Sequence, residues 1–534
     1  MDLLIAAIGL LVAVWAVLPR ERRLDLELRF GLFDAALIAT SVVAIGYLDL
    51  YSFFKAHHWT RGLPTWTVGL VPAQVEHLVL ILLLLIVGLR GRFAWLSARK
   101  ISRFRALTDE LLWSESYYEL LVLFQTHIKR FFKIYHGDFW SRRLRARWLP
   151  DFSLASLVRA LDNQERVPQP PQLVGGIIRP VIARLPDYNV EISIAAHTAR
   201  NVLLSRGFVG VLARSRPYLG IEIMESLMTP GDGFFREEFV ELYFDALLAH
   251  KTGIFYSELA NNCNRAGLRR YRIPNENRLL YFLFANDQIA HELQVWRPVG
   301  EFMLRELDQL SREPEADPYN HAYMEEEKWQ SESPLFAGVQ FFEIMVSEAL
   351  FQGIKWHMWL YYTTYLVKKI VRNYAPTDDP LVRANVSEPI WYSHLLYVIF
   401  SALRDWILAV QEVPEDQANV LLESTRADHD NGNIPKSAIL ALGDCLHSIV
   451  CSDKLEKELR DMLIDVVLNV YFELRAARRL DRYAETLIDS IRRGGPRLRT
   501  IWTGIYRDRI NAAIQRQDRV SHGSYLSDLE AALP

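Results

Sequence analysis

The densest group of side chains that could bind a ligand lies between residues 261 and 278. This stretch places asparagines and arginines between two apolar segments of helical character. The candidate ligand-binding residues in it are Asn264, Arg265, Arg269, Arg270, Arg272 and Arg278. Guanidinium groups form paired hydrogen bonds with carboxylate or phosphate oxygens, so this composition favours an anionic ligand. A hydrogen-bonded turn between two helices is the simpler explanation of the same residues.

A second candidate pair lies near the C-terminus, where Arg516 and His522 are six residues apart. This separation resembles that of the Arg and His used by all-helical ribonucleases of the HEPN type. The resemblance implies a membrane-associated ribonuclease as an alternative function. The pair alone does not assign the family, and the sequence indicates no other catalytic residue.

Other motifs that could carry chemistry fail a test of spacing. The His-Glu pair at 291–292 would need a second His at position 295 to bind zinc, and that residue is Val295. The acidic loop 428–433 resembles a calcium loop, but its sixth position is Asn433 where an EF-hand has Gly. We therefore expect no metal and no cofactor, and the balance of the sequence is against an enzyme.

Four ionisable residues lie in or beside apolar segments of membrane-spanning length. Asp34 lies about one turn inside such a segment and Asp49 ends it, while Glu76 and His77 begin the next one. Charge inside a bilayer is costly and usually serves a function, so an oligomeric channel or pore-forming effector is a second alternative. The simpler interpretation is that all four lie at interface depth, where they are hydrated or paired.

The elements that would position these groups begin with a predicted transmembrane region, residues 1–90. Its three hydrophobic segments cover about 3–18, 31–50 and 70–89, and about 20 helical residues span a bilayer. Lys and Arg cluster after the first and third segments, which places those flanks on the cytoplasmic side. We therefore predict an inner or plasma membrane protein with its N-terminus outside and its C-terminal body in the cytoplasm.

A basic, helical collar is predicted next to the membrane over residues 91–160. Residues 90–147 hold 13 Lys and Arg against 5 Asp and Glu, and residues 148–534 hold 42 against 52. Each basic side chain near an anionic lipid surface contributes about 1 kcal/mol. Interleaved aromatic residues would also suit nucleic acid, but the membrane is closer, so nucleic acid is not an expected partner. The expected lipid-surface residues are Arg90, Arg92, Arg99, Lys100, Arg103, Arg105, Arg142, Arg143 and Arg145.

A Pro- and Gly-rich linker, 161–186, leads to a cytoplasmic helical body at 187–534. Helical spacing of apolar residues runs through this body and strand-like alternation is scarce, so the predicted fold class is all-α. The nearly uncharged stretch 336–371 is predicted to be a buried core helix, because scattered Glu and Lys residues argue against a fourth membrane crossing. The predicted helices cover about 192–212, as one helix or two, and then 235–250, 276–291, 297–310, 336–371, 391–410, 437–449, 454–480 and 482–493.

The composition limits the remaining possibilities. Three cysteines are too few for a disulfide framework and suit a body in a reducing compartment. The predicted function is that of a membrane-anchored helical protein whose cytoplasmic domain binds a partner or ligand. It would act as a scaffold, sensor or effector without catalysis of its own. The expected partners are an anionic bilayer surface and a protein, which includes self-association.

Overall fold

The all-α class predicted from the sequence is confirmed. In the computed structural model, helices cover most of the described residues, and the sheet among them has only two short strands. The structure describes residues 16–57, 71–92, 96–148, 181–228, 233–264, 269–322, 332–355, 360–375, 390–417, 419–420, 433–494 and 504–533, with Gly9, Ala13 and Trp502. Most of the first predicted membrane segment and most of the predicted linker lie outside them.

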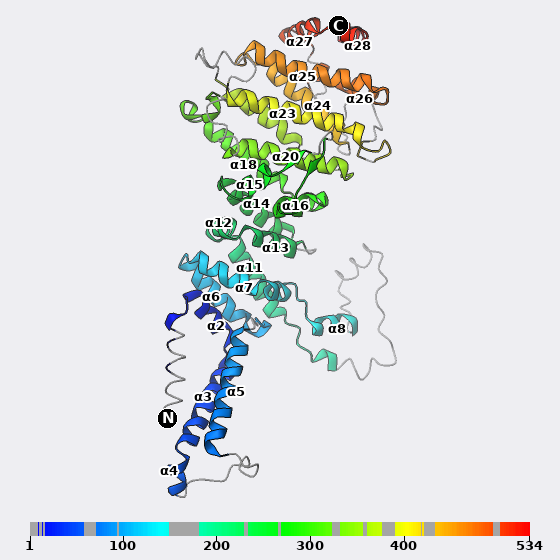
Figure 1. The fold of residues 1–534 in the computed structure, drawn as a ribbon. Coiled ribbons are helices and arrows are strands. Elements are labelled where there is room, and N and C mark those ends of the chain that lie inside the picture. The colour runs from blue at the N-terminus through cyan, green and yellow to red at the C-terminus, as the bar shows by residue number, and fades with distance from the viewer. Residues whose placement is uncertain are drawn as a thin grey trace. The chain divides into compact units, whose positions relative to one another are not determined.

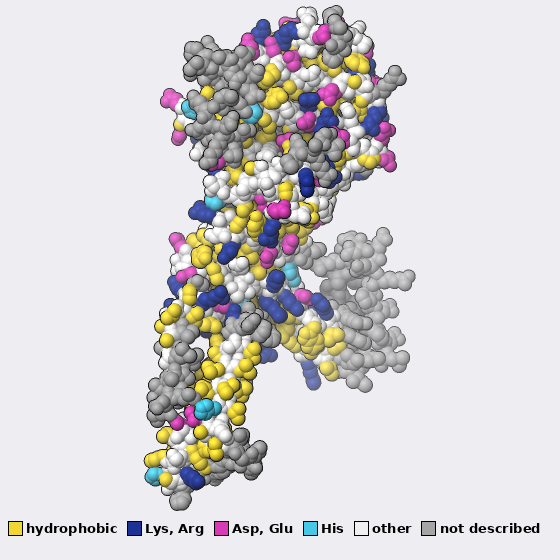
Figure 2. Space-filling model, in the orientation of Figure 1, with side chains coloured by type: hydrophobic (Ala, Val, Ile, Leu, Met, Phe, Trp, Pro, Cys, Tyr) yellow, Lys and Arg dark blue, Asp and Glu magenta, His cyan; other side chains and the backbone are white. Residues whose placement is uncertain are grey.

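The chain divides into two compact units, Met1–Leu212 and Ala213–Pro534. The first unit contains an apolar helix pair in which α3 (Leu32–Asp49) and α5 (Pro72–Arg92) pack side by side (Figure 1). Hydrophobic side chains gather along this pair on the surface (Figure 2). The exposed large side chains of α5 are Leu78, Ile81, Leu82, Leu84, Leu85 and Leu89. These two helices correspond to the second and third predicted membrane segments.

Three helical stretches in the described chain are long and apolar enough to cross a membrane. Only 11% of Pro72–Leu89 is buried, whereas 83% of Pro334–Phe351 and 67% of Trp391–Glu412 are buried. A fourth would be the pair Arg22–Arg29 and Asp34–Asp49, which is bent by 86°. A buried apolar helix finds its apolar surroundings inside the protein, so Pro72–Leu89 has the strongest need for lipid.

Apart from α4, which packs against the end of α3, the rest of the first unit contains a small helical bundle, formed by the part of the chain that includes the predicted collar. Helix α11 packs against α6 and α7 of this bundle. The compact division therefore falls after the predicted start of the body at residue 187. The bounds of these elements are α2 Arg20–Arg29, α4 Tyr51–Ala56, η2 Ala98–Lys100, α6 Ile101–Trp113, α7 Tyr117–Tyr135, α8 Trp140–Trp148 and α11 Asn189–Leu203. Helix α12, Arg206–Ser215, contains the point of division.

The second unit is a stack of helices in which α24 packs against α21, α23, α25 and α26 (Figure 1). Its helices are α13 Pro217–Leu227, α14 Gly233–Ala249, α15 Ile254–Ala260, α16 Arg278–Phe284, α17 Asp287–Leu293, α18 Trp296–Leu310, α20 Pro334–Phe351, α21 Leu360–Asn373, α23 Trp391–Leu408, α24 Ile434–Val450, α25 Lys457–Ala476, α26 Asp481–Arg493, α27 Gly504–Arg516 and α28 Arg519–Ala532. Short 3-10 turns are η3 Pro314–Ala316, η4 Pro318–Asn320, η5 Ala409–Glu412 and η6 Arg478–Leu480.

Two long predicted helices are each divided in the structure. The stretch 276–291 becomes α16 and α17, because the Asn286 side chain accepts a hydrogen bond from the Gln288 N–H and starts a new helix. The stretch 336–371 becomes α20 and α21. Gly353 follows α20 with a φ of +76°, a left-handed conformation that favours glycine and ends the helix.

Candidate ligand-binding site

Three of the arginines predicted to bind a ligand, Arg269, Arg270 and Arg272, lie at a short pair of β-strands on the surface of α20. Strand β1, Cys263–Asn264, pairs antiparallel with β2, Tyr271–Arg272. The Ser347 hydroxyl of α20 donates a hydrogen bond to the Arg269 carbonyl oxygen at 3.0 Å. Next to this contact, the side chains of Arg269 and Arg270 face two different groups of acidic residues.

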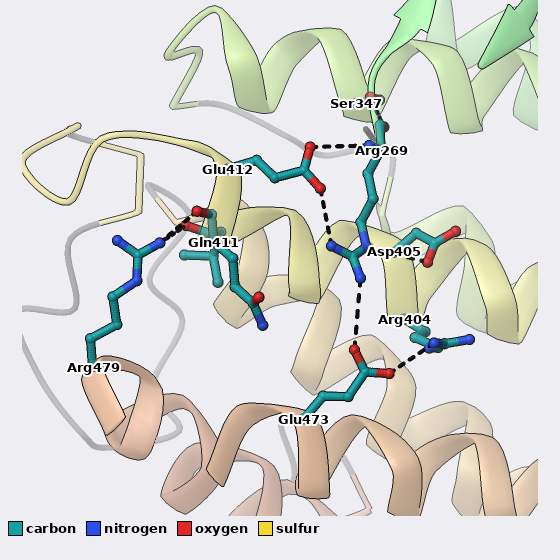
Figure 3. A network of polar contacts seen from close by, with 9 residues as sticks. Arg269, Ser347, Arg404, Asp405, Gln411, Glu412, Glu473 and Arg479 are labelled. Carbon is teal, nitrogen blue, oxygen red and sulfur yellow. Dashed lines mark hydrogen bonds and ion pairs between the residues drawn. The ribbon is translucent and has the colours of Figure 1, made fainter. Parts of the chain in front are cut away.

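Arg269 lies among three carboxylates that come from three different elements (Figure 3). Its Nη1 is 3.0 Å from Glu412 Oε1, and its backbone N–H donates to Glu412 Oε2 at 3.1 Å. Asp405 and Glu473 are each 3.7 Å away, and Glu473 also accepts a hydrogen bond from Arg404 at 2.8 Å. Burial raises the pKa of Asp405, although the Coulomb attraction of Arg269 and Arg404 opposes the shift.

Arg270 forms a paired contact with Glu348 of α20. Arg270 Nη2 donates to Glu348 Oε2 at 2.8 Å and Nε donates to Oε1 at 3.1 Å. The hydrogen bonds to Glu348 raise the pKa of Arg270 above its usual value. The Arg270 guanidinium also lies 5.4 Å from the centre of the Phe351 ring. This geometry is the fork-to-carboxylate arrangement in which arginine binds most strongly.

A further carboxyl group, that of Asp287, is buried beside this pair. Gln352 links the two groups, because its amide donates to Glu348 at 3.2 Å and its oxygen accepts from the Asp287 N–H at 2.8 Å. Asp287 is 0% exposed, and within the described part of the chain neither of its carboxyl oxygens has a hydrogen-bond partner. Burial, and then the nearby Glu348 carboxylate, raise the pKa of Asp287 well above its usual range.

Arg278 and the asparagines of the cluster stabilise the start of α16. The Arg278 guanidinium lies 4.5 Å from the centre of the Tyr218 ring. Asn277 donates to the Glu258 carbonyl oxygen at 2.9 Å, and Asn261 donates to Asn277 at 2.9 Å. The Glu258 carboxylate accepts hydrogen bonds from the first N–H groups of α16, at Leu279 and Leu280. These contacts match the hydrogen-bonded turn that was the simpler explanation of the cluster.

The remaining predicted ligand-binding residues are placed less completely. Arg272 is exposed on β2. Asn264 lies in β1, with its side chain outside the described part of the structure, and Arg265 lies outside the described residues altogether. Since Arg269 and Arg270 already contact carboxylates of the chain itself, an anionic ligand would have to replace those contacts.

Sequence reasoning found the arginines and missed the carboxylates that surround them. Glu348 is separated from Arg270 by 78 positions and Glu412 from Arg269 by 143, so spacing along the chain does not connect them. The available signal was the presence of isolated acidic residues in apolar helices such as α20 and α23. A charge in a buried stretch indicates that a partner is close in space.

A second buried polar network, also missed, joins α2 to α7 in the first unit. Arg29 Nη2 and Nε donate to the two oxygens of Asp25 at 2.6 and 3.0 Å, and His127 Nε2 lies 2.9 Å from Asp25 Oδ1. Asp25, Arg29 and His127 are 5%, 6% and 1% exposed. Burial raises the pKa of Asp25, but the hydrogen bonds from His127 and Arg29 outweigh burial and lower it.

Several residues predicted at the lipid surface make contacts within the protein. Lys100 donates to the carbonyl oxygens of Leu28 and Arg29 at 2.8 and 2.7 Å, and Arg103 is 3.4 Å from the Phe30 carbonyl oxygen. Both side chains therefore stabilise the C-terminal end of α2. Arg105 pairs with Asp109, Arg143 pairs with Asp138, and Arg145 donates to the Leu185 carbonyl oxygen. Arg99 is exposed and Arg142 is half-buried, while the side chains of Arg90 and Arg92 lie outside the described part of the structure.

The predicted intramembrane residues have local roles where the structure describes them. Asp34 accepts a hydrogen bond from the Gly31 N–H at 2.9 Å and so caps α3. Glu76 is 8% exposed, and His77 Nδ1 lies 2.5 Å from the Ala73 carbonyl oxygen in its own helix. Asp49 is at the end of α3.

The Arg516 and His522 pair lies on two helices. Arg516 is the last residue of α27 and pairs with Asp461 of α25 at 2.7 Å. His522 is on α28, and its side chain is among those that the structure does not describe. The ribonuclease alternative therefore gains no observation in its favour.

Over the described residues, the geometry defines an almost entirely helical protein with an exposed apolar helix of membrane-spanning length, α5, and a paired arginine–carboxylate site in its larger unit. Within the described ranges, no group of three or more His, Cys, Asp or Glu side chains could hold a metal ion. Comparison of the chain with protein-family models, with curated proteins and with solved structures found no match.

Proposed function

We propose that this protein is a membrane-anchored scaffold or sensor that holds a helical, partner-binding unit at the cytoplasmic face of a membrane. The observation that carries the proposal is the exposure of α5. Its apolar side chains Leu78, Ile81, Leu82 and Leu85 are 53%, 62%, 55% and 56% exposed. A row of this kind is unfavourable in water and favourable in the hydrocarbon core of a bilayer.

The distribution of charge supports the cytoplasmic orientation. Helix α5 ends in Arg90 and Arg92, and the basic collar follows it, whereas its other end begins at Pro72 with few basic residues nearby. Positively charged flanks remain on the cytoplasmic side when a protein inserts. The larger, acidic unit follows the collar and would therefore lie in the cytoplasm.

A partner-binding role for the second unit is supported by the acidic surface around Arg269. The side chains of Asp405 and Glu473 remain 45% and 35% exposed, although both lie close to buried helices. Three carboxylates face one guanidinium there, with Arg404 as a second cation. Partly exposed charge of this kind contributes more to the choice of a partner than to stability.

Reporter fusions test the membrane crossing. An enzyme that is active only outside the cytoplasm is fused after His57 or after Arg105 in the full chain. The first fusion should be active and the second silent, because α5 lies between them. The double substitution Leu82→Arg and Leu85→Arg should abolish this difference, since each arginine at mid-membrane depth costs about 3 kcal/mol of insertion free energy.

The matched control is Tyr118→Arg, an exposed aromatic residue of α7 outside the predicted spans. It should leave both reporters as in the unmodified chain. Equal activity of the two fusions in the unmodified chain would show that α5 does not cross. Activity only after Arg105 would reverse the orientation and with it the cytoplasmic placement of the second unit.

Proximity labelling in cells tests partner binding. The labelling enzyme is attached at the C-terminus of the full chain, and the neighbours are compared with those of an Asp405→Asn, Glu473→Gln variant. A specific set should be lost in the variant and retained with Asp245→Asn, which removes a surface carboxylate paired with Arg305. If the unmodified chain, the double variant and Asp245→Asn label the same neighbours, the acidic surface around Arg269 does not bind the partner.

A further inference from the structure

The lipid-surface residues expected from the sequence are partly used inside the protein, which raises the question of which cations remain available. Lys100 and Arg103 contact the last carbonyl groups of α2, and Arg105 pairs with Asp109 at 3.4 Å. Arg143 and Arg145 likewise contact Asp138 and the Leu185 carbonyl oxygen. A headgroup would compete with these contacts most strongly at Lys100, which has two short hydrogen bonds, and least at Arg143, whose side chain is 75% exposed.

Helix α2 offers a second set of cations. It connects the first predicted membrane segment to α3, and it is bent by 86° from α3. One face of α2 is covered, because Leu24, Asp25, Leu28 and Arg29 are all buried at its contacts with α6 and α7. Arg22 is exposed, and the Arg20 side chain is 50% exposed with a single 3.5 Å contact to Glu119.

The position of α2 follows from its connections. Two membrane segments that are joined by a ten-residue helix must leave the bilayer on the same side. A helix that runs nearly perpendicular to the span it precedes then lies along the surface, at the depth of the lipid headgroups. Arg99, which is exposed and immediately precedes Lys100, lies beside the C-terminal end of the same helix.

We propose that α2 is an in-plane helix whose Arg20 and Arg22, together with Arg99, bind the phosphate groups of anionic phospholipids. This inference rests on the membrane anchorage proposed above and names the lipid class that the anchor prefers. Clustered arginines pair with phosphate oxygens, and an anionic leaflet attracts cations that lie within a Debye length of it. Figure 2 shows Lys and Arg side chains gathered where the apolar pair of α3 and α5 meets the small bundle of the first unit.

The Asp25, Arg29 and His127 network has a defined place in this arrangement. It fixes the covered face of α2 against α7 through contacts of 2.6 to 3.0 Å. Because this face is held, Arg20 and Arg22 in the exposed first turn of α2 keep a constant orientation toward the lipid. Arg29 is buried and hydrogen-bonded to Asp25, so it is not among the arginines proposed to bind lipid.

The test uses the full chain in mixed micelles of a non-ionic detergent, with a fluorescent phosphatidylglycerol or phosphatidylcholine as the probe. The unmodified chain should bind phosphatidylglycerol more tightly, and added salt should weaken this binding. The variant Arg20→Gln, Arg22→Gln, Arg99→Gln should lose about fivefold in affinity for each arginine removed. Arg22→Gln alone should lose about fivefold, with unchanged thermal unfolding as evidence that it folds.

The control removes the same charge elsewhere, through Arg200→Gln, Arg206→Gln and Arg214→Gln on the exposed faces of α11 and α12. It should keep the affinity of the unmodified chain. Equal losses in the control and the triple variant would reduce the effect to net charge and overturn the inference. Competition by inorganic phosphate beyond that of chloride at equal ionic strength would assign the site to a soluble anion instead.

Failure of this inference is distinguishable from failure of the proposed function. If the reporters show that α5 crosses the membrane but the unmodified chain binds both phospholipids equally, the anchorage stands and the headgroup site does not. If α5 does not cross, α2 has no reason to lie in the headgroup plane and both proposals fall.

Discussion

The two units of this protein each contain a buried carboxyl group, and the two groups have opposite electrostatic character. Asp25 in the first unit is 5% exposed and Asp287 in the second is 0% exposed. Asp25 receives two hydrogen bonds from Arg29 and one contact from His127, and its pKa is lowered. Asp287 lies beside the carboxylate of Glu348, and its pKa is raised. Burial is nearly equal, so the partners decide the sign.

The difference implies opposite dependences of stability on pH. A carboxyl group with a lowered pKa stabilises the fold above its unfolded value of 3.8, and this contribution is lost as pH falls through the folded pKa. A carboxyl group with a raised pKa does not reduce the stability below pH 3.8, where it is protonated in both the folded and the unfolded state. As pH rises from 3.8 toward the folded pKa, the group lowers the stability of the fold more and more. Asp25 therefore favours folding at neutral pH, while Asp287 opposes it.

The largest expected effect is that of Asp25→Asn. The substitution leaves the Arg29 guanidinium buried without its carboxylate, and breaking a buried pair costs about 3 to 5 kcal/mol. Amide hydrogen exchange in α2 and α7 of the full chain in detergent should show a loss of protection of this size. The double substitution Asp25→Asn, Arg29→Gln should recover much of it, because no charge is left uncompensated. Unchanged protection in Asp25→Asn would contradict the electrostatic account.

Glu348→Gln should have the next largest effect. It removes the paired contact with Arg270, whose side chain is 33% exposed and can therefore regain part of its hydration. We expect a loss of about 1 to 3 kcal/mol in the free energy of unfolding, measured by denaturant titration of the second unit within the full chain. Arg305→Gln, which removes a more exposed pair with Asp245, is the control and should have a smaller effect.

Asp287→Asn should have the opposite sign. It replaces a buried carboxyl group by a neutral group of the same shape, so it should stabilise the second unit by about 1 kcal/mol at pH 7. The gain should grow as pH rises and should vanish below about pH 4. Glu292→Gln, an exposed neighbour on α17, should show neither the gain nor its pH dependence. A destabilised Asp287→Asn would mean that Asp287 is ionised and paired in the folded protein.

The smallest effect is expected at the surface pair of Arg143 and Asp138. Their side chains are 75% and 40% exposed, and exposed ion pairs contribute about 0.5 kcal/mol or less. Asp138→Asn should therefore leave hydrogen exchange in α7 and α8 nearly unchanged. A loss as large as that of Asp25→Asn would show that burial is not what separates strong pairs from weak ones in this protein.

Only the arginines of the candidate ligand-binding site could be predicted from the sequence. The concentration of arginines between 261 and 278 pointed to a polar junction, and Arg269 and Arg270 do lie at one. Their partners Glu348, Glu412 and Glu473 could not be assigned from the chain, because each comes from a different helix far along the sequence. The collar shows the same limit, since the contacts of Lys100 with the carbonyl oxygens of Leu28 and Arg29 join residues more than 70 positions apart.

The sequence by itself determined the properties that depend on residue spacing and on local composition. Apolar spacing indicated helices throughout, and the length and flanking charge of residues 70–89 indicated a membrane-spanning helix, because both depend only on neighbours along the chain. Tertiary structure alone decided which apolar helices are buried and which charges are compensated. Pro334–Phe351 and Pro72–Leu89 are both apolar, yet 83% of the first and 11% of the second are buried. The physical reason is that burial and ion pairing depend on distances between remote segments, which composition and spacing do not contain.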